Sequence, residues 1–129
     1  KNFLNDLPDS IQWVDGSGLS RQDLFTPRTM IALLLKIWEK VGNEQRLHSL
    51  FPAGGLTGTI QHAYKTDNGV PFVWAKTGSL SNNHNQSGYV ITRKGKRLVY
   101  SFMNNNFITP VAGVRDEMVR VITEIHNRF

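Results

Sequence analysis

The clearest hydrophobic pattern lies between residues 27 and 41, where apolar side chains recur at helical spacing. They share one broad face, and charged residues occupy the other; the apolar set is Met30, Ile31, Leu34, Leu35, Trp38 and Val41. Thr26 is a suitable N-cap, Pro27 suits the first helical position, and Gly42 favours a helix end. The pattern predicts an amphipathic helix whose apolar stripe belongs to the core.

The same spacing returns near the C-terminus. Thr109 and Pro110 repeat the cap-and-proline start, and the following apolar face is Val111, Val114, Met118, Val121, Ile122 and Ile125. We expect this second helix to lie across a sheet. The pattern also predicts a short helix over residues 45–51 and a single helical turn over residues 60–64.

Three short apolar and aromatic runs predict strands over residues 71–77, 87–92 and 98–103. A turn at Asp67-Asn68-Gly69 precedes the first strand, and a basic turn around Gly95 joins the other two as a hairpin. Residues 81–86 form a polar stretch that predicts a loop. Because the strands are almost continuously apolar, we expect an antiparallel sheet covered on both faces, in an α+β or α/β fold.

Length and composition favour one ordinary globular domain over residues 1–129. The chain is 40% apolar and 19% charged, and no apolar run approaches the roughly 20 residues of a membrane span. The first six residues lack the apolar centre of a signal peptide, which carries little weight if the chain is a fragment. The absence of cysteine excludes thiol nucleophiles, thiolate zinc sites and disulfides within these residues.

The formal net charge is +5, and the one basic cluster brackets the hairpin turn at Arg93, Lys94, Lys96 and Arg97. A solvated hairpin tip is favoured over nucleic-acid binding, because no recognition motif accompanies the charge. A mild positive field favours anionic partners such as a peptide carboxylate or a cell-wall polymer. The four histidines are too widely spaced for a local metal motif, so neither a metal nor another cofactor is predicted.

Lys76, Thr77 and Gly78 carry the most specific candidate chemistry, at the end of the first predicted strand. The lysine can place a cation in a cleft, the threonine hydroxyl can hold a carboxylate, and the glycine lets a ligand lie against the backbone. The next residue, Ser79, can offer its main-chain N–H to a developing oxyanion. The alternative is a lysine and a turn at a strand end, because three residues often match by chance.

Two glycine-rich stretches and one histidine complete the candidates. Asp15, Gly16, Ser17 and Gly18 specify a tight loop, and a structural loop beside a site is favoured over a phosphate cradle. The second glycine-rich stretch, residues 52–59, either approaches a substrate or makes a surface connection. His84 lies near the proposed cleft, and a solvated loop histidine is favoured over a catalytic base.

Several stretches together resemble one protein family. Lys-Thr-Gly is a motif shared by penicillin-binding proteins and class A β-lactamases. The stretches, in chain order, are Asp15-Gly16-Ser17-Gly18-Leu19-Ser20-Arg21, Pro27, Leu50-Phe51-Pro52-Ala53-Gly54-Gly55, Gly58-Thr59-Ile60, Ala75-Lys76-Thr77-Gly78-Ser79-Leu80 and Ser87-Gly88-Tyr89-Val90. The chain resembles the C-terminal part of the D-alanyl-D-alanine carboxypeptidase/endopeptidase family of the penicillin-binding protein 4 type.

The resemblance implies a β-lactamase-like fold and serine acyl transfer on peptidoglycan stem peptides, with penicillins as acylating inhibitors. The family nucleophile is the serine of Ser-x-x-Lys, supported by a Ser-x-Asn motif upstream of residue 15. No serine here has a lysine three positions later, and Ser81-Asn82-Asn83 has the second spacing on the wrong side of Lys76. We therefore expect a C-terminal fragment that is inactive alone and leaves strand edges open to self-association.

By the same resemblance, Lys76 and Thr77 bind the substrate carboxylate, Gly78 and Leu80 line the cleft, and the Ser79 N–H forms half of an oxyanion hole. The location implied is periplasmic or secreted. Asp23 stands where relatives often carry asparagine, and Asn82-Asn83-His84 replaces their usual glycine and valine, which predicts a different substrate preference at the rim. The alternative function is a non-catalytic peptidoglycan-binding module.

Overall fold

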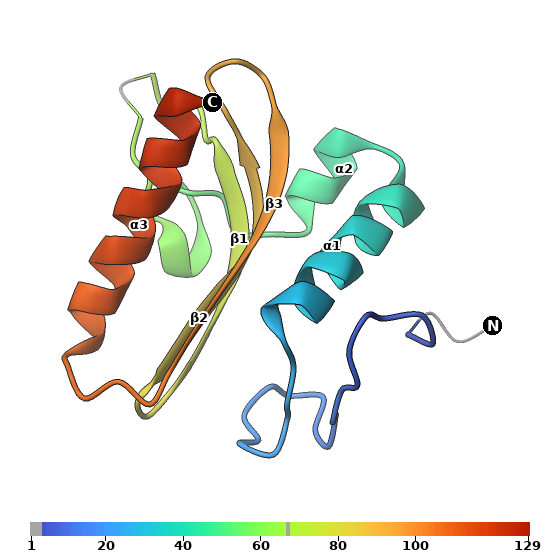
Figure 1. The fold of residues 1–129 in the computed structure, drawn as a ribbon. Helices are drawn as coiled ribbons and strands as arrows, with labels where there is room; N and C mark the ends of the chain where they lie inside the picture. Colours follow the sequence, from blue (N-terminus) through green and yellow to red (C-terminus); the bar gives the residue numbers. More distant parts are fainter. Residues whose placement is uncertain (1–3, 67) are drawn as a thin grey trace.

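A computed structural model describes residues 4–66 and 68–129, and it places a three-stranded antiparallel sheet between helices (Figure 1). The strands lie in the order β1-β2-β3, with α3 over one face and α1 and α2 over the other. In chain order the elements are α1 (Pro27–Val41), α2 (Glu44–Ser49), a 3₁₀ turn η1 (Gly58–Ile60), β1 (Val73–Leu80), β2 (Asn83–Ile91), β3 (Arg97–Asn105) and α3 (Val111–Arg128). The predicted α+β class and the sheet covered on both faces are confirmed, whereas Asp67 of the predicted turn lies outside the described residues.

Helix α1 begins and ends where the sequence predicts. The Thr26 hydroxyl accepts a hydrogen bond from the Thr29 N–H at 3.1 Å, and Gly42 closes the helix in the left-handed region at φ 62°. The inner face differs at one position. Leu35 was expected in the stripe but is 46% exposed, while Ile37 packs against the core around Leu34. The stripe is therefore rotated slightly from the predicted one.

Helix α3 starts one residue later than the cap-and-proline pattern predicts. Pro110 is itself the N-cap, with extended backbone and no side-chain capping bond, so the prediction of Thr109 as the cap is wrong. The predicted apolar face is confirmed, since Met118 and Ile122 are buried. Among the helices of residues 4–66 and 68–129, none has both the length and the apolar character that a membrane crossing needs.

The predicted strand boundaries are wrong where β1 ends and β2 begins. Strand β1 runs on to Leu80, so Lys76-Thr77-Gly78 lies within the strand instead of closing it. Strand β2 already begins at Asn83, so most of the loop predicted over residues 81–86 is strand. Only two residues make the turn, with Asn82 at φ 61°. The single helical turn is η1, two residues before the predicted position, and α2 also starts and ends earlier than predicted.

Polar residues can extend β2 because the folded chain supplies a partner for each. The buried Gln86 carboxamide oxygen accepts hydrogen bonds from the hydroxyls of Tyr64 and Tyr100, the latter at 2.8 Å. The Asn85 side-chain oxygen accepts from the Asn104 N–H at 3.0 Å. A buried polar group without a partner costs several kcal/mol, about 1–3 in proteins, so these bonds are what permits the strand.

The core has two parts, one on each face of the sheet. Ile60, Phe72, Val73 and Ile122 belong to the part under α3, and Leu34, Leu47 and Tyr89 to the part under α1 and α2. Between them, β1 and β2 approach closely at Gly88, which pairs with Ala75.

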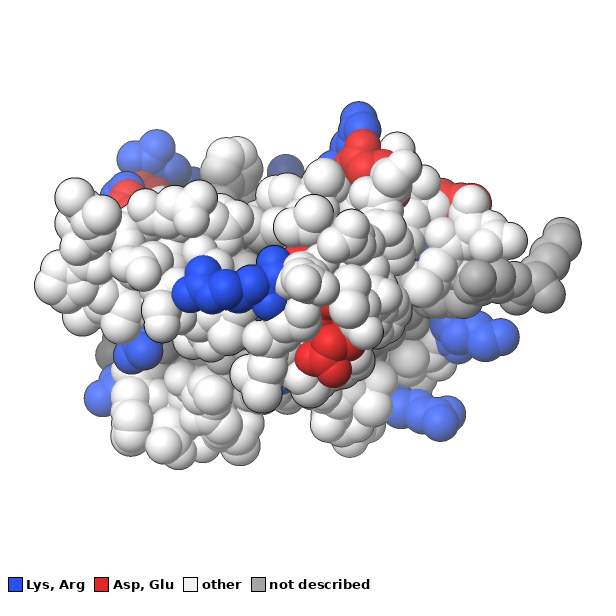
Figure 2. Space-filling view, turned by 90° about the horizontal axis from the view of Figure 1, so that it is seen from below, with Lys and Arg blue, Asp and Glu red and all other residues white. Residues whose placement is uncertain are grey.

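Two basic side chains of the hairpin bind different helices. Arg93 donates to the Asn127 side chain of α3 at 2.7 Å, and Arg97 forms an ion pair with Glu44 of α2 at 2.7 Å. Figure 2 shows the opposite end of the molecule from this hairpin, and there too Lys and Arg side chains stand apart, with acidic groups beside some of them. These contacts favour a hairpin that supports the fold over a continuous basic surface for nucleic acid.

Substitution of Gly88 by alanine is expected to destabilise the domain. A Cβ at this position would lie 2.2 Å from the Trp74 carbonyl oxygen, a contact with backbone that a rotamer change cannot relieve. We expect a loss of about 1–3 kcal/mol in the free energy of unfolding, measured by urea titration followed by circular dichroism. Gly16→Ala is the matched control, because a Cβ there meets nothing within 4 Å. Equal stabilities of the two variants would contradict the close approach.

The carboxylate of Asp9 is expected to stabilise the start of α1 in a pH-dependent way. Hydrogen bonds from Arg28 and then from Thr26 lower its pKa to about 2. Because the folded pKa is below the unfolded value of about 3.9, the contribution is complete above that value and is lost as pH falls towards 2.

The gap in Tm between wild type and Asp9→Asn should therefore close between about pH 4 and pH 2. Thermal unfolding followed by circular dichroism measures it. Asp116→Asn, at an exposed position on α3, is the control. A gap that stays constant over this range would show that the Asp9 charge is not the cause.

Candidate active site

Strand β1 has an open edge along its second half. One side of β1 pairs with β2 along its whole length. On the other side, the Ala75 N–H donates to the Pro52 carbonyl at 3.0 Å and the Gly54 N–H donates to the Val73 carbonyl at 2.9 Å. Within residues 4–66 and 68–129, no backbone segment pairs with this side beyond Ala75. The backbone of the glycine-rich segment over residues 52–59 thus pairs with β1 only as far as Ala75, while the side chain of its last residue, Thr59, contacts Thr77.

The peptide groups at the open edge belong to Thr77 and Ser79. Main-chain N–H and C=O groups alternate in direction along a strand, so every second residue directs them to the same side. Thr77 and Ser79 therefore direct theirs to the side used by Val73 and Ala75. The N–H of Ser79 is therefore directed out of the sheet at this edge. An acceptor that lies alongside β1 can bind it without displacing a strand.

The side chains of this stretch alternate between the two faces of the sheet. Those of Thr77 and Ser79 lie on the α3 face, in a common pocket. Lys76 lies on the other face, is exposed, and its ammonium donates to the Thr77 carbonyl oxygen at the strand edge. Gly78 and Leu80 do not line the pocket. The structure thus places the side chains of two predicted site residues, Thr77 and Ser79, in one pocket. The third, Lys76, lies on the opposite face and contacts only the edge of the strand.

The pocket on the α3 face has a volume of about 250 Å³. Strands β1 and β2 form its floor, and η1 and α3 form its walls. The hydroxyls of Thr59 and Thr77 are 2.7 Å apart across it, which fixes the Thr77 side chain. Its lining comprises Thr59, Ile60, Ala63, Thr77, Ser79, His84, Gln86, Arg115, Met118 and Val119.

His84 lies inside this pocket, and the expectation of a solvated loop histidine is wrong. The residue is 3% exposed, and its Nδ1 atom is 2.7 Å from the Ser79 hydroxyl oxygen. The two residues stand directly opposite each other in the register of β1 and β2. Burial, and then the positive charge of Arg115, lower the pKa of His84. Side chains alternate along β2, so His84 shares the α3 face with Gln86, Gly88 and Val90. The sequence-based prediction missed this because it assigned residues 81–86 to a loop.

The loop of Asp15, Gly16, Ser17 and Gly18 is held by its own hydrogen bonds. The Asp15 carboxylate accepts from the Ser17 hydroxyl and from the Ser17 N–H, and these bonds lower the pKa of Asp15. Gly18 has φ 76°, a conformation that favours glycine. None of these four residues lines the pocket.

Asp23 and Arg21, which follow this loop in the chain, hold it in place. Asp23 accepts hydrogen bonds from the N–H groups of Val14 at 2.8 Å and Asp15 at 3.0 Å. Arg21 donates to the Ser81 carbonyl at 2.8 Å, in the turn between β1 and β2. The predicted supporting loop is therefore tied to the end of the Lys-Thr-Gly strand, and its support of a site stays a prediction.

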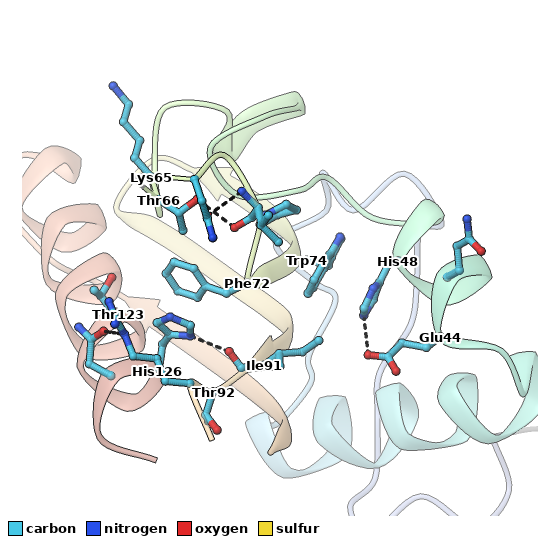
Figure 3. Close-up of a pocket in the computed structure, with 16 residues that line it drawn as sticks. Glu44, His48, Lys65, Thr66, Phe72, Trp74, Ile91, Thr92, Thr123 and His126 are labelled. Carbon is cyan, nitrogen blue, oxygen red and sulfur yellow. Dashed lines mark hydrogen bonds and ion pairs between the residues drawn. The ribbon is translucent and has the colours of Figure 1, made fainter. Parts of the chain in front are cut away.

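A larger hollow, of about 950 Å³, lies at the opposite end of β1 and contains none of residues 76–80 (Figure 3). His48 of α2 stacks on Trp74 at 3.5 Å between ring centroids, and His126 of α3 stacks on Phe72 at 3.8 Å. Both rings are used in packing, and burial lowers the pKa of His48. In the described residues, no three His, Asp or Glu side chains gather in a way that could hold a metal ion.

The sequence model of the D-Ala-D-Ala carboxypeptidase 3 (S13) family matches residues 8–125. The chain belongs to this family. A curated relative, the D-alanyl-D-alanine carboxypeptidase DacB of Haemophilus influenzae, is 36% identical over 99 residues, which are 74% of this chain and 20% of the relative. The penicillin-sensitive carboxypeptidase A of Dictyostelium discoideum is 28% identical over 120 residues, which are 86% of this chain and 23% of that protein.

Solved structures agree with the sequence comparison. The crystal structure of penicillin-binding protein 4 from H. influenzae matches with a TM-score of 0.74 and 28% identity, over 91% of this chain and 28% of that one. A predatory endopeptidase from Bdellovibrio bacteriovorus, in complex with an immunity protein, matches with a TM-score of 0.62 over 88% of this chain and 32% of that one. At 18% identity the second match shows the fold alone.

The resemblance read from the sequence is thus confirmed at the level of family and fold. The chain spans between 20% and 23% of the length of the two curated relatives.

Proposed function

We propose that this chain forms one wall of the active site of a serine D-Ala-D-Ala carboxypeptidase or endopeptidase that acts on peptidoglycan stem peptides. One observation carries the proposal: the Lys-Thr-Gly strand ends in an open edge, at which the Ser79 N–H points outward beside a pocket that contains the Thr77 hydroxyl. A peptide can add to such an edge as a further strand. Its scissile carbonyl would then lie against the Ser79 N–H.

Each group at this edge has a role that its position allows. The Ser79 N–H stabilises the oxyanion of the tetrahedral intermediate, a contribution of about 3 kcal/mol for one such donor. The Thr77 hydroxyl, held by Thr59, binds the terminal carboxylate. The ammonium of Lys76 supplies positive potential at the strand edge, and Gly78 leaves the backbone uncovered.

The nucleophile, in this proposal, comes from outside these residues, because no serine here stands in Ser-x-x-Lys. That serine would attack the carbonyl, form an acyl-enzyme and contribute the second oxyanion donor through its own N–H. This chain alone would then be inactive. Its partner is the N-terminal part of the same protein. The outer side of β3, which pairs with no strand among residues 4–66 and 68–129, is open to that part or to a second copy.

Two relatives support this assignment. The H. influenzae protein is a D-alanyl-D-alanine carboxypeptidase, and a crystal structure of it holds a β-lactam. The D. discoideum protein is a penicillin-sensitive carboxypeptidase. We extend this to β-lactam binding here, and to a place in the bacterial cell envelope, periplasmic or secreted. The alternative is a non-catalytic module that binds peptidoglycan through the same edge.

The gene product that contains this chain is expected to react covalently with a fluorescent penicillin, and the 129-residue chain alone is not. The reason is that the edge of β1 stabilises the intermediate but supplies no attacking hydroxyl. Labelling is read on a denaturing gel after both proteins are incubated with the probe. Labelling of the isolated chain would contradict the proposal, and a gene product that binds peptidoglycan without labelling would support the non-catalytic module.

Replacing the ammonium of Lys76 should slow this reaction. We expect Lys76→Met to lower the second-order rate constant of penicillin acylation roughly 10- to 100-fold, which is the typical loss for a hydrogen bond to a charged group. Stopped-flow or gel-based kinetics on the gene product measure it. Lys94→Met, at an exposed position in the hairpin, is the matched control. Equal rates for the two variants would remove Lys76 from the site.

A further inference from the structure

The contact between the side chains of Ser79 and His84 has no role in the function proposed above. In antiparallel strands, opposite residues whose peptide groups point away from each other bring their side chains closest. Ser79 and His84 form such a pair, and their Oγ and Nδ1 atoms are 2.7 Å apart. Ser79 is at the exposed mouth of the pocket, and His84 is buried behind it. A ligand group that enters the pocket would therefore contact the Ser79 hydroxyl directly, and the His84 ring would act on the ligand only through that hydroxyl.

The direction of this hydrogen bond decides what the hydroxyl offers to a ligand. A serine hydroxyl has one proton, whereas a neutral imidazole has one donor nitrogen and one acceptor nitrogen. If Nδ1 is the acceptor, the proton of Ser79 is directed to His84, and only oxygen lone pairs face the pocket. If Nδ1 carries a proton, the ring donates to Oγ, and the hydroxyl proton is free for a carboxylate.

Among the described residues that line this pocket, Arg115 is the one Lys, Arg, Asp or Glu side chain. Arg115 projects from α3 into the same pocket, and its charge opposes a proton on the ring. The partners from β1 and η1 are the neutral hydroxyls of Ser79, Thr77 and Thr59, and on β3 Asn104 binds the backbone oxygen of His84. An anion between Arg115 and Ser79 would cancel the opposing charge.

We propose that His84 is a positioning residue for carboxylate ligands in this pocket, because a proton on its Nδ1 turns the Ser79 hydroxyl towards the ligand beside Thr77. The inference rests on the proposed function and explains how the same site would select a carboxylate over a neutral group. A proton stands on Nδ1 in one neutral tautomer and in the protonated ring, and a bound carboxylate favours both forms. By linkage, binding to the protonated ring is favoured by acid. Burial and then the charge of Arg115 hold the pKa of His84 below its ordinary value, so the effect develops towards acid.

The test compares a carboxylate with its neutral ester in the gene product that contains this chain. The probes are benzylpenicillin and benzylpenicillin methyl ester, and the readout is the ratio of their second-order acylation rate constants between pH 5 and pH 8. For wild type we expect this ratio to rise about tenfold towards acid, the value of one strengthened hydrogen bond. For His84→Gln, which keeps a polar side chain but does not titrate, we expect a flat ratio.

Two further variants separate the role of the pair from a general effect. Ser79→Ala retains the backbone N–H and removes the hydroxyl, so its ratio should also be flat, and adding His84→Gln should change nothing more. His62→Gln replaces an exposed histidine outside the pocket, and its ratio should follow wild type. The inference is overturned if His84→Gln keeps the pH dependence of wild type.

A binding measurement keeps this outcome distinct from a failure of the proposed function. If neither compound acylates the wild-type gene product, the proposed function fails. The pocket is then tested by the ¹⁵N shift of His84 Nδ1 during titration with N-acetyl-D-alanine. A shift towards the protonated form on binding supports the inference, and an unchanged shift at saturating ligand overturns it.

Discussion

The site depends on the close pairing of β1 with β2 on one side only. At Gly88 the two strands approach so closely that a Cβ would lie 2.2 Å from the Trp74 carbonyl oxygen. That contact fixes the register, and a slip by one residue would move every side chain of β1 to the other face of the sheet. Thr77 would then leave the α3 pocket, and the Ser79 N–H would point into β2 instead of out of the sheet.

On its second side, β1 is covered by backbone over its first half only. The segment around Ala53 covers the strand as far as Ala75, through two backbone hydrogen bonds. From Lys76 onwards no other described backbone segment pairs with this edge, and an exposed edge ordinarily favours aggregation. Here the exposed stretch carries a lysine, a glycine and two hydroxyl residues, whose polarity suits a bound peptide better than a second apolar strand.

Polar residues at the far end of the sheet link fold and site. The side chains of His84, Asn85 and Gln86 would oppose a strand if they stood alone, and each is instead hydrogen-bonded to a neighbouring element. Gln86 binds two tyrosine hydroxyls, and burial raises the pKa of Tyr64 to about 12, so that hydroxyl stays a donor. The same bonds that permit the strand also build the floor of the pocket.

The sequence by itself determined the elements whose evidence is local. The caps and the spacing of α1, the apolar face of α3, the three strands and the family all follow from neighbouring residues and short motifs. Periodicity reports which side chains share a face, and a motif reports which groups stand together along the chain. Neither depends on a distant part of the molecule.

Only the tertiary structure decided where β1 ends, that residues 83–86 are strand, and that His84 is buried against Ser79. In each case a partner on another strand satisfies a polar group that local reasoning assigns to solvent. The open edge was also a tertiary outcome, because it depends on where the Ala53 segment stops pairing. Hydrogen bonding across the fold, which has no local pattern, is the physical reason for the difference.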